Sequence, residues 1–277
     1  VYMSVYIHGG LRSPIGVLNG QYKHMRPEIL GSQVIDEIIN RYTISHIDGI
    51  FCGNAVGTGG NLGRLMGLMC NLPNSVPAIT VDMQCASALM SIEIAYAHIV
   101  SGIMDSAIAG GIESSSLQPE RVYASGDDRE GPYKVAQFTP QDQSPLAMLK
   151  GAERTIHKYN VTKEDLYPHI IGSHQRASAA LDNPYLQSYI MPITIDGKRC
   201  IDECIRPTMN EKLLSRMKPL LGADSITNAG NACLTHDGAA FVYLSNKKGP
   251  FKIHSVKPWA GNPQFSPEGA LESTEGI

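Results

Sequence analysis

The sequence contains no long apolar run, no excess of basic residues and no close pair of cysteines. No stretch approaches the roughly 20 apolar residues that a bilayer-spanning helix needs, so we expect no membrane segment. With 23 basic and 26 acidic residues, the net charge is −3. This charge argues against a general attraction to nucleic acid. Residues 1–10 are short of basic character and are predicted to form a strand, not a signal peptide.

The cysteine usage argues against a disulfide scaffold or a zinc site. The six cysteines show no C-x-x-C pair and no dense spacing, which predicts a reducing, cytoplasmic setting. Cys200 and Cys204 have no histidine beside them at a spacing typical of zinc sites, so we predict no metal there. A length of 277 residues, with 43% apolar and 18% charged residues, instead predicts a soluble globular protein with more than one subdomain. The cysteines are Cys52, Cys70, Cys85, Cys200, Cys204 and Cys233.

Strand and helix patterns alternate in the first part of the chain. Apolar runs predict strands at 5–7, 50–52, 78–83 and 107–109, and spacings of three and four predict helices at 27–42, at 62–72 and after residue 85. Such alternation is typical of an α/β fold in which helices cover both faces of a sheet. Strands are predicted again at 239–244 and 251–256, and residues 5–7 and 251–253 are expected to share one sheet.

The middle of the chain, from about 113 to 224, has a different character. Residues 115–145 are rich in Ser, Gln, Asp, Gly and Pro, which indicates an irregular connection. Helices are predicted at 146–159, from Thr162 to about 181 with a kink at Pro168, and from Asn210. The middle region is therefore predicted to be inserted into the α/β domain.

Cys85 occupies the junction between the predicted strand at 78–83 and the next helix. A thiol in the first turn of a helix faces unpaired backbone N–H groups and the positive end of the helix dipole, and both favour the nucleophilic thiolate. Its neighbours 86–88 are small and leave room for a substrate. The alternative is an inert buried thiol, because free cysteines are commonly buried. The apolar positions of the predicted helix are Leu89, Ile92, Tyr96, Ile99 and Ile103.

Four segments resemble, in the same order, segments of thiolases, the enzymes that join or cleave acyl-CoA thioesters. They are RSPIG at 12–16, DMQCASAL at 82–89, DSAIAGGIES at 105–114, and NAGNA with DGAA at 228–232 and 237–240. The chain is identified as a member of the thiolase family, of the acetyl-CoA C-acetyltransferase or 3-ketoacyl-CoA thiolase type. The resemblance runs across almost the whole chain.

The resemblance implies an α/β, thiolase-like layered fold with helices on both faces of a mixed sheet and an inserted loop domain. It places the N-terminal α/β domain at residues 1–112 and 225–256, and the CoA-contacting loop domain at 113–224. Residues 257–277 resemble the stretch that leads into a second, C-terminal domain. The resemblance also implies a cytoplasmic homodimer or homotetramer with acyl-CoA as its partner. No permanently bound cofactor, nucleic acid or membrane is implied.

The implied reaction is a two-step acyl transfer. Cys85 takes an acyl group from a CoA thioester, the substrate, and a second nucleophile then attacks the acyl-enzyme. The backbone N–H of Cys85 could also help to hold an oxyanion. The family's CoA contacts fall on Arg206, whose guanidinium would lie near the adenine, and on Met148, Ala229 and Cys233. A solvated surface position for Arg206 and ordinary helix packing for Met148 are the alternatives.

The chain also departs from the family pattern. Ala88 stands where thiolases usually have glycine, Ala147 where biosynthetic members often have histidine, and Cys233 where the family has serine. These changes do not alter the predicted reaction class, but they leave the preferred acyl-chain length undetermined. The segment SHQRA at 173–177 matches the family, and we predict a structural role for it.

Three family segments of the second half do not occur in these 277 residues: Asn-Glu-Ala-Phe, Gly-His-Pro and Cys-x-Gly-Gly. In thiolases they supply water positioning, activation of the nucleophile and proton transfer. We therefore expect a fragment, a truncated product or a subunit completed by another chain, inactive by itself. A non-catalytic thiolase-like protein with a binding or assembly role is the alternative. Ketoacyl synthases share the fold, but the segments around Gly110 and Asp237 fit thiolases better.

Overall fold

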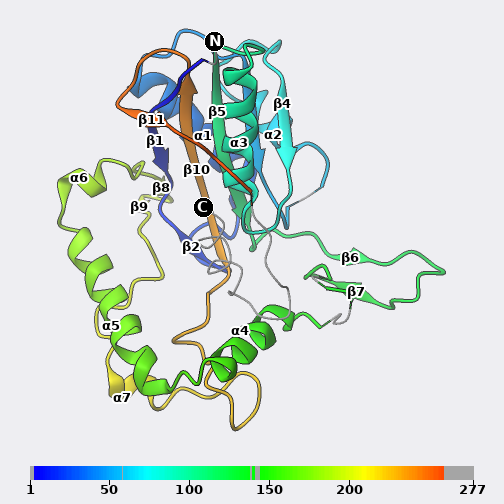
Figure 1. Ribbon diagram of the computed structural model, residues 1–277, viewed down its shortest axis with the longest axis vertical. Coiled ribbons are helices and arrows are strands. Elements are labelled where there is room, and N and C mark those ends of the chain that lie inside the picture. Colours follow the sequence, from blue (N-terminus) through cyan, green and yellow to red (C-terminus); the bar gives the residue numbers. More distant parts are fainter. Residues whose placement is uncertain (1–2, 58, 138, 141–143, 259–277) are drawn as a thin grey trace. The chain divides into compact units, whose positions relative to one another are not determined.

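The computed structural model describes residues 3–57, 59–137, 139–140 and 144–258 (Figure 1). The chain forms two compact units, and each is described by itself. The sheet unit contains the described residues up to Pro119, with Tyr185–Cys204 and Thr235–Pro258. The loop unit contains the described residues of Glu120–Pro184 and Ile205–Leu234. A further domain was predicted to start at 257–277. Of these residues, 259–277 lie outside the part of the chain that the structure describes.

The sheet unit is built on a mixed sheet in the order β11-β1-β10-β5-β3-β4, with β2 paired to β10. The three strands β3, β4 and β5 are parallel to one another, and β10 runs antiparallel to both β5 and β1. Residues 5–7 pair with 251–253, which confirms the prediction that they share a sheet. The strands are β1 Val5–Arg12, β2 Gly16–Val17, β3 Gly49–Gly53, β4 Ala78–Val81, β5 Ser106–Ser114, β10 His236–Ser245 and β11 Phe251–Ile253.

Helices cover both faces of this sheet, as the α/β pattern predicted. Side chains alternate along a strand, so Ile50 and Cys52 of β3 lie in one buried cluster and Phe51 in the other. The first cluster packs against α1, Pro27–Arg41, and α2, Leu62–Gly67; the second packs against α3, Ser87–Val100 (Figure 1). The start of α1 follows from its sequence, because it has a proline in its first turn and an acidic residue beside the helix N-terminus.

The predicted apolar stripe of α3 is confirmed at Ile92, Tyr96 and Ile99, which pack in the second cluster, but not at its two ends. Leu89 is 55% exposed, and Ile103 lies beyond the end of the helix and is 69% exposed. The buried positions are instead spaced by four residues and are mostly small: Ser87, Ser91, Ala95 and Ile99. Small side chains face the sheet because the strands beneath them carry glycines and the helix approaches closely.

The bounds of the two units differ from the predicted domain bounds of 113–224. Residues 185–204 belong to the sheet unit, because the guanidinium of Arg12 forms a two-point ion pair with Asp202 at 2.7 and 2.8 Å. Residues 225–234 belong to the loop unit. The segment 185–204 also contains the hairpin of β8, Thr194–Ile195, and β9, Lys198–Arg199. The described part of the loop unit therefore comes from two separate stretches of chain.

The loop unit is mainly helical. Its helices are α4 Ala147–Lys158, α5 Lys163–Ala180 and α7 Glu211–Leu214, and a short hairpin joins β6 Arg121–Val122 to β7 Pro132–Tyr133. The predicted capping pattern is confirmed, since Thr162 and Asp165 form a reciprocal capping box at the start of α5. The short α6, Pro184–Gln187, spans the boundary between the units. Among the described helices of the whole chain, none combines the length and apolar character needed to cross a membrane.

Candidate active site

Cys85 lies in the turn between β4 and α3. Gln84, the residue before it, has a left-handed backbone with a φ of 52°, and the N–H of Ala86 donates to the carbonyl of Met83 at 3.1 Å. Ala86 is the N-cap of α3, so the helix begins at Ser87. The prediction that Cys85 lies in the first helical turn is therefore wrong by a small margin. The chain uses residues 83–86 to reverse direction before the helix can start.

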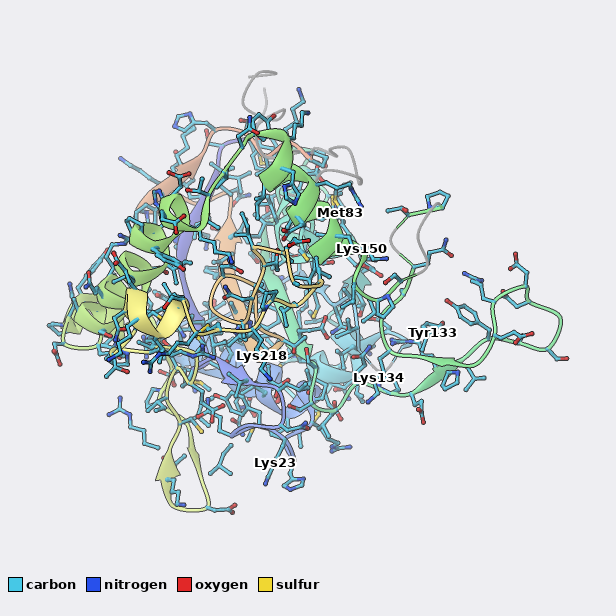
Figure 2. The ribbon with its side chains drawn as sticks, turned by 90° about the horizontal axis from the view of Figure 1, so that it is seen from below. Lys23, Met83, Tyr133, Lys134, Lys150 and Lys218 are labelled. Carbon is cyan, nitrogen blue, oxygen red and sulfur yellow. The ribbon has the colours of Figure 1, made fainter. Side chains whose placement is uncertain are left out.

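The side chain of Ser87 closes this turn. The backbone N–H of Met83 donates to Ser87 Oγ at 2.8 Å, and the Ser87 hydroxyl donates to the carbonyl of Gln84 at 2.5 Å. Ser87 is buried, and Met83 is labelled in Figure 2. The hydroxyl thus joins the chain before Cys85 to the helix after it. From the sequence we expected Ser87 only to leave space; its position as the first helical residue was the available signal.

Two glycines let the start of α3 lie directly on the sheet. A Cβ on Gly53 of β3 would lie 2.5 Å from the backbone N of Ala88 and 2.5 Å from the carbonyl carbon of Ser87. A Cβ on Gly111 of β5 would lie 3.1 Å from the Cβ of Ala88. The extra methyl of Ala88, compared with the usual family glycine, is accommodated because Gly111 has no side chain there.

Ser91 ties the next turn of α3 to the sheet. Its Oγ accepts from the N–H of Gly110 at 2.9 Å and donates to the Gly110 carbonyl at 2.8 Å. Ser91 is fully buried. The helix α3, which follows Cys85, is therefore held on the sheet in two ways: its backbone contacts Gly53, and its buried Ser91 forms hydrogen bonds with Gly110.

Glu113, at the end of β5, fixes the loop that follows β3. One carboxylate oxygen accepts from the N–H groups of Ala55 and Val56 at 2.9 and 3.0 Å, and the other accepts from the Asn54 amide at 2.9 Å. Because β3, β4 and β5 are parallel, their carboxyl ends lie on the same side of the sheet. This loop and the Cys85 turn therefore both follow strand ends on that side. Glu113 was not predicted as a site residue from the sequence; a carboxylate at the end of a buried strand is the signal that could have revealed it.

The six thiols differ in their surroundings. Cys85 and Cys233 are exposed, Cys204 is half-buried, and the other three are buried. Burial raises the pKa of Cys52 to about 12 and the pKa of Cys70 to about 12. The exposed position of Cys85 removes the alternative of an inert buried thiol.

In the loop unit, α4 is bound to the segment 225–227 through Glu153. Its carboxylate accepts from the backbone N–H groups of Ile226 and Thr227 at 2.8 and 3.1 Å, from Ser225 Oγ at 3.0 Å and from Thr227 Oγ1. Burial works against the charge, but these hydrogen bonds outweigh it and hold the pKa of Glu153 below its ordinary value of 4.5. Glu153 therefore connects the helix of Met148 to the segment that leads to Ala229.

Arg206 is held through its backbone by α5. The N–H of Arg206 donates to Nδ1 of His174 at 3.1 Å. Burial, together with the positive charge of Arg206, lowers the pKa of His174 below 6.5, so the ring is neutral and can accept at neutral pH. This contact gives the predicted structural role of the SHQRA segment a specific partner.

The structure places the predicted site residues in different units. Cys85 belongs to the sheet unit, and Met148, Arg206, Ala229 and Cys233 belong to the loop unit. Met148 is 42% exposed, so it is not a packed core residue of α4. Ala229 and Cys233 are exposed and Arg206 is half-buried. Two cations of the same unit, Lys150 on α4 and Lys218 after α7, are labelled in Figure 2.

A surface hollow of about 600 Å³ lies on the hairpin of the loop unit and contains none of the predicted site residues. The Tyr123 and Tyr133 rings are stacked there with centroids 4.2 Å apart, and the Arg129 guanidinium lies 4.2 Å from the Tyr123 centroid. Arg129 is also paired with Asp127 at 2.8 Å. These side chains satisfy one another and stiffen the hairpin.

The sequence matches the family model described as Thiolase, N-terminal domain, over residues 5–248. A Staphylococcus epidermidis protein, named as an inferred acetyl-CoA C-acetyltransferase VraB, is 34% identical over 245 residues. The match covers 84% of this chain and 62% of that protein. A Staphylococcus aureus protein with the same name is 31% identical over 249 residues, which are 87% of this chain and 65% of the relative.

Two solved structures share the fold with a TM-score of 0.79 and 25% identity. They are the acetyl-CoA acetyltransferase of Bacillus anthracis and human mitochondrial 3-ketoacyl-CoA thiolase in complex with CoA, and 88% of this chain is covered in each case. This chain spans 66% and 65% of those two chains. The family model covers far more than half of the residues, from 5 to 248. The chain therefore belongs to the thiolase family and contains its N-terminal domain.

Proposed function

We propose that this chain is the acyl-accepting part of a thiolase-type acyltransferase, with Cys85 as the residue that carries the acyl group. The observation that carries the proposal is the exposed thiol of Cys85 in a fixed turn between β4 and α3. The substrate is a CoA thioester, either acetyl-CoA or acetoacetyl-CoA, or a longer 3-ketoacyl-CoA. No permanently bound cofactor takes part.

In the first step, the Cys85 thiolate attacks the carbonyl carbon of the thioester. The carbon–sulfur bond to CoA breaks, the CoA thiolate leaves with the electron pair, and a new thioester forms on Cys85. For condensation or thiolysis, a second nucleophile then attacks the Cys85 thioester and releases the thiol. The known relatives support this class of reaction, because their names describe acetyl-CoA acetyltransferases and a 3-ketoacyl-CoA thiolase.

We also propose that the loop unit binds the CoA portion through Arg206, Met148, Ala229 and Cys233. Two observations support this assignment: the half-buried position of Arg206 and the exposed sulfur-bearing side chain of Met148. We expect Arg206→Ala to weaken CoA binding in calorimetry, because a guanidinium can stack on the adenine and lie near its phosphates. Arg216→Ala, at an exposed arginine of the same unit, is the matched control. Equal losses in both variants would contradict the assignment.

The test of acyl transfer is intact-mass analysis of the chain after incubation with acetyl-CoA or acetoacetyl-CoA. We expect one added acetyl group on the wild-type chain and on Cys204→Ala, and none on Cys85→Ala. Acetylation that persists in Cys85→Ala would contradict the assignment. Binding of CoA with no acetylation at all would favour the alternative, a non-catalytic thiolase-like protein with a binding or assembly role.

We propose that the chain forms a homodimer or homotetramer through the edge of the sheet. β4 is the last strand on that side, and an edge strand offers unpaired backbone groups to another chain. Apolar side chains are exposed around it: Ile79 of β4 and Leu65, Leu68 and Met69 on and after α2 are each more than 40% exposed. Light scattering should show that Ile79→Lys lowers the molar mass, while Ile103→Lys, at an exposed position beyond α3, leaves it unchanged.

We propose a cytoplasmic location, which the free state of all six cysteines supports. When cells are lysed in denaturant with a maleimide and without a reductant, all six thiols of the chain should be labelled. Labelling of fewer thiols would indicate an oxidising compartment.

A further inference from the structure

We infer that Ser87 is the positioning residue for the Cys85 thiol. The inference rests on the proposed function of Cys85 and adds a specific role for the serine hydroxyl. Ser87 does not touch the reacting atoms in this scheme. It fixes the backbone that precedes the nucleophile relative to the helix that follows it.

The hydroxyl makes its two bonds to the two residues directly before Cys85. It accepts from the N–H of Met83 at 2.8 Å and donates to the carbonyl of Gln84 at 2.5 Å. A hydroxyl has one donor and two acceptor sites, so both bonds form at the same time. The Ser87 side chain therefore holds both ends of the peptide segment that leads into Cys85.

The segment needs such a restraint because Gln84 is held in an unfavourable conformation. Its φ of 52° lies in the left-handed region, which costs a non-glycine residue free energy and persists only where neighbouring contacts enforce it. Three further bonds support the turn: the N–H of Gln84 donates to Asp82 Oδ1 at 2.8 Å, the N–H of Ala86 to the Met83 carbonyl at 3.1 Å, and the N–H of Ser87 to the Gln84 carbonyl at 3.1 Å. Without the Ser87 hydroxyl, the N–H of Met83 loses its acceptor and the Gln84 carbonyl keeps only the backbone donor, so the turn loosens and the direction of the Cys85 side chain changes with it.

The backbone of Ser87 lies directly on the sheet. Ser87 is 5% exposed, and its carbonyl carbon lies so close to Gly53 that a Cβ on the glycine would approach it to 2.5 Å. Ser87 thus contacts β3 through its backbone and the Cys85 turn through its hydroxyl, so it fixes the turn relative to the strand. Ser91, one helical turn later, is also a buried serine bonded to backbone, but its partners are Gly110 of β5 and the carbonyl of Ala88 in its own helix.

This difference makes Ser91→Ala the matched control for Ser87→Ala. Each variant removes one buried serine hydroxyl from the sheet-facing side of α3, and only Ser87→Ala releases the Cys85 turn. In the full chain, acyl transfer from acetyl-CoA to Cys85 should fall about 100-fold in Ser87→Ala, as expected for a misplaced nucleophile. It should stay within about threefold of wild type in Ser91→Ala, which leaves the turn bonds in place. Ser87→Thr, which keeps a hydroxyl, should recover most of the rate.

A second measurement reads the turn without any acyl transfer. The Met83 amide hydrogen should exchange slowly with solvent in wild type and Ser91→Ala, and fast in Ser87→Ala, because Ser87 Oγ accepts it. Resistance of the buried thiols Cys52 and Cys70 to alkylation serves as the internal reference for an intact sheet unit. Fast exchange of Met83 in the folded wild type would overturn the positioning role and leave the proposed function standing.

Two further outcomes are decisive. If acyl transfer falls equally in Ser87→Ala and Ser91→Ala, in proportion to their loss of stability, the role of Ser87 is only structural and the inference fails. If the Met83 amide is protected but wild-type Cys85 accepts no acyl group, the proposed function fails, and the positioning role fails with it.

Discussion

The sheet unit and the loop unit hold their candidate residues by different means. In the sheet unit, Cys85 is placed by backbone packing, because the glycines of β3 and β5 let α3 lie directly on the sheet. In the loop unit, polar side chains hold the candidate residues: the buried Glu153 binds the segment 225–227, and the half-buried His174 binds the backbone of Arg206. The helix α5 has no buried residue at all. Cys85 is thus held by backbone packing as well as by the hydrogen bonds of Ser87 and Ser91, while the described anchors of the proposed CoA residues are hydrogen bonds.

The largest effect should separate acyl acceptance from turnover. We expect the 277-residue chain to accept an acyl group on Cys85 but to catalyse acetoacetyl-CoA thiolysis several orders of magnitude more slowly than a thiolase that carries the Gly-His-Pro and Cys-x-Gly-Gly segments. Members of a catalytic constellation act as a unit, and these segments do not occur in the sequence. Spectrophotometric assay of the purified chain tests this, with Cys85→Ala as the control. Robust turnover that disappears in the control would mean that other residues of the chain replace the missing groups.

The next effect concerns thiol reactivity and compares the two units directly. Iodoacetamide at neutral pH, followed by peptide mapping, should label Cys85 fastest and Cys52 and Cys70 slowest. The two buried thiols have a pKa raised to about 12, so only about one molecule in 10⁵ carries the thiolate at pH 7. Cys233 is the reference in the loop unit, since it is exposed but does not precede a helix. Faster labelling of Cys52 or Cys233 than of Cys85 would refute the nucleophile assignment.

A third prediction breaks the backbone packing of the sheet unit. Gly53→Ala should lower the free energy of unfolding by about 2 kcal/mol, because the new methyl meets backbone atoms of Ser87 and Ala88 that cannot move aside easily. Gly67→Ala in α2 is the control. Its Cβ would meet a side-chain end, the Ile50 Cδ1, at 3.1 Å, and alanine favours the helix. Urea unfolding of both variants makes the measurement, and equal stability would argue against close contact between α3 and the sheet.

The fourth prediction breaks the polar anchor of the loop unit. Because the folded-state pKa of Glu153 lies below its ordinary value, its stabilisation is complete above the unfolded-state pKa of about 4.5 and is lost as the pH falls through the lower folded-state value. Glu153→Gln should therefore lower the free energy of unfolding by about 2 kcal/mol at pH 7 and by less in acid. Glu120→Gln, at an exposed position of the same unit, should change neither. An unchanged pH dependence in Glu153→Gln would contradict the anchor role.

The alternation of strands and helices was predictable because buried strands and one-sided helices leave periodic apolar patterns. The strand Ile50–Cys52 and the helix α1 follow from such patterns, and the start of α5 follows from its capping pair. The sheet-facing side of α3 followed at Ile92, Tyr96 and Ile99, but its first two turns did not. Periodicity counts apolar residues, but Ser87 and Ser91 face the sheet there because glycines leave room only for small side chains.

The side chains that anchor the candidate site could not be identified from the sequence either. Glu113 and Glu153 bind backbone groups close to each of them in space but 57 to 74 residues away along the chain, and no local pattern marks such partners. The ion pair of Arg12 with Asp202, which brings residues 185–204 to the sheet unit, spans 190 residues. By contrast, Cys85 was found because its chemistry depends on its immediate neighbours.

The place of β10 in the sheet has a consequence for how the protein is made. β10 lies between β1 and β5, yet β5 ends at Ser114 and β10 begins only at His236. At roughly 5–20 residues per second, the inner edges of β1 and β5 wait on the order of ten seconds for their partner. During that time both edges can pair with other nascent chains. We expect the yield of folded protein to depend on chaperones that bind the chain before residue 245 is made.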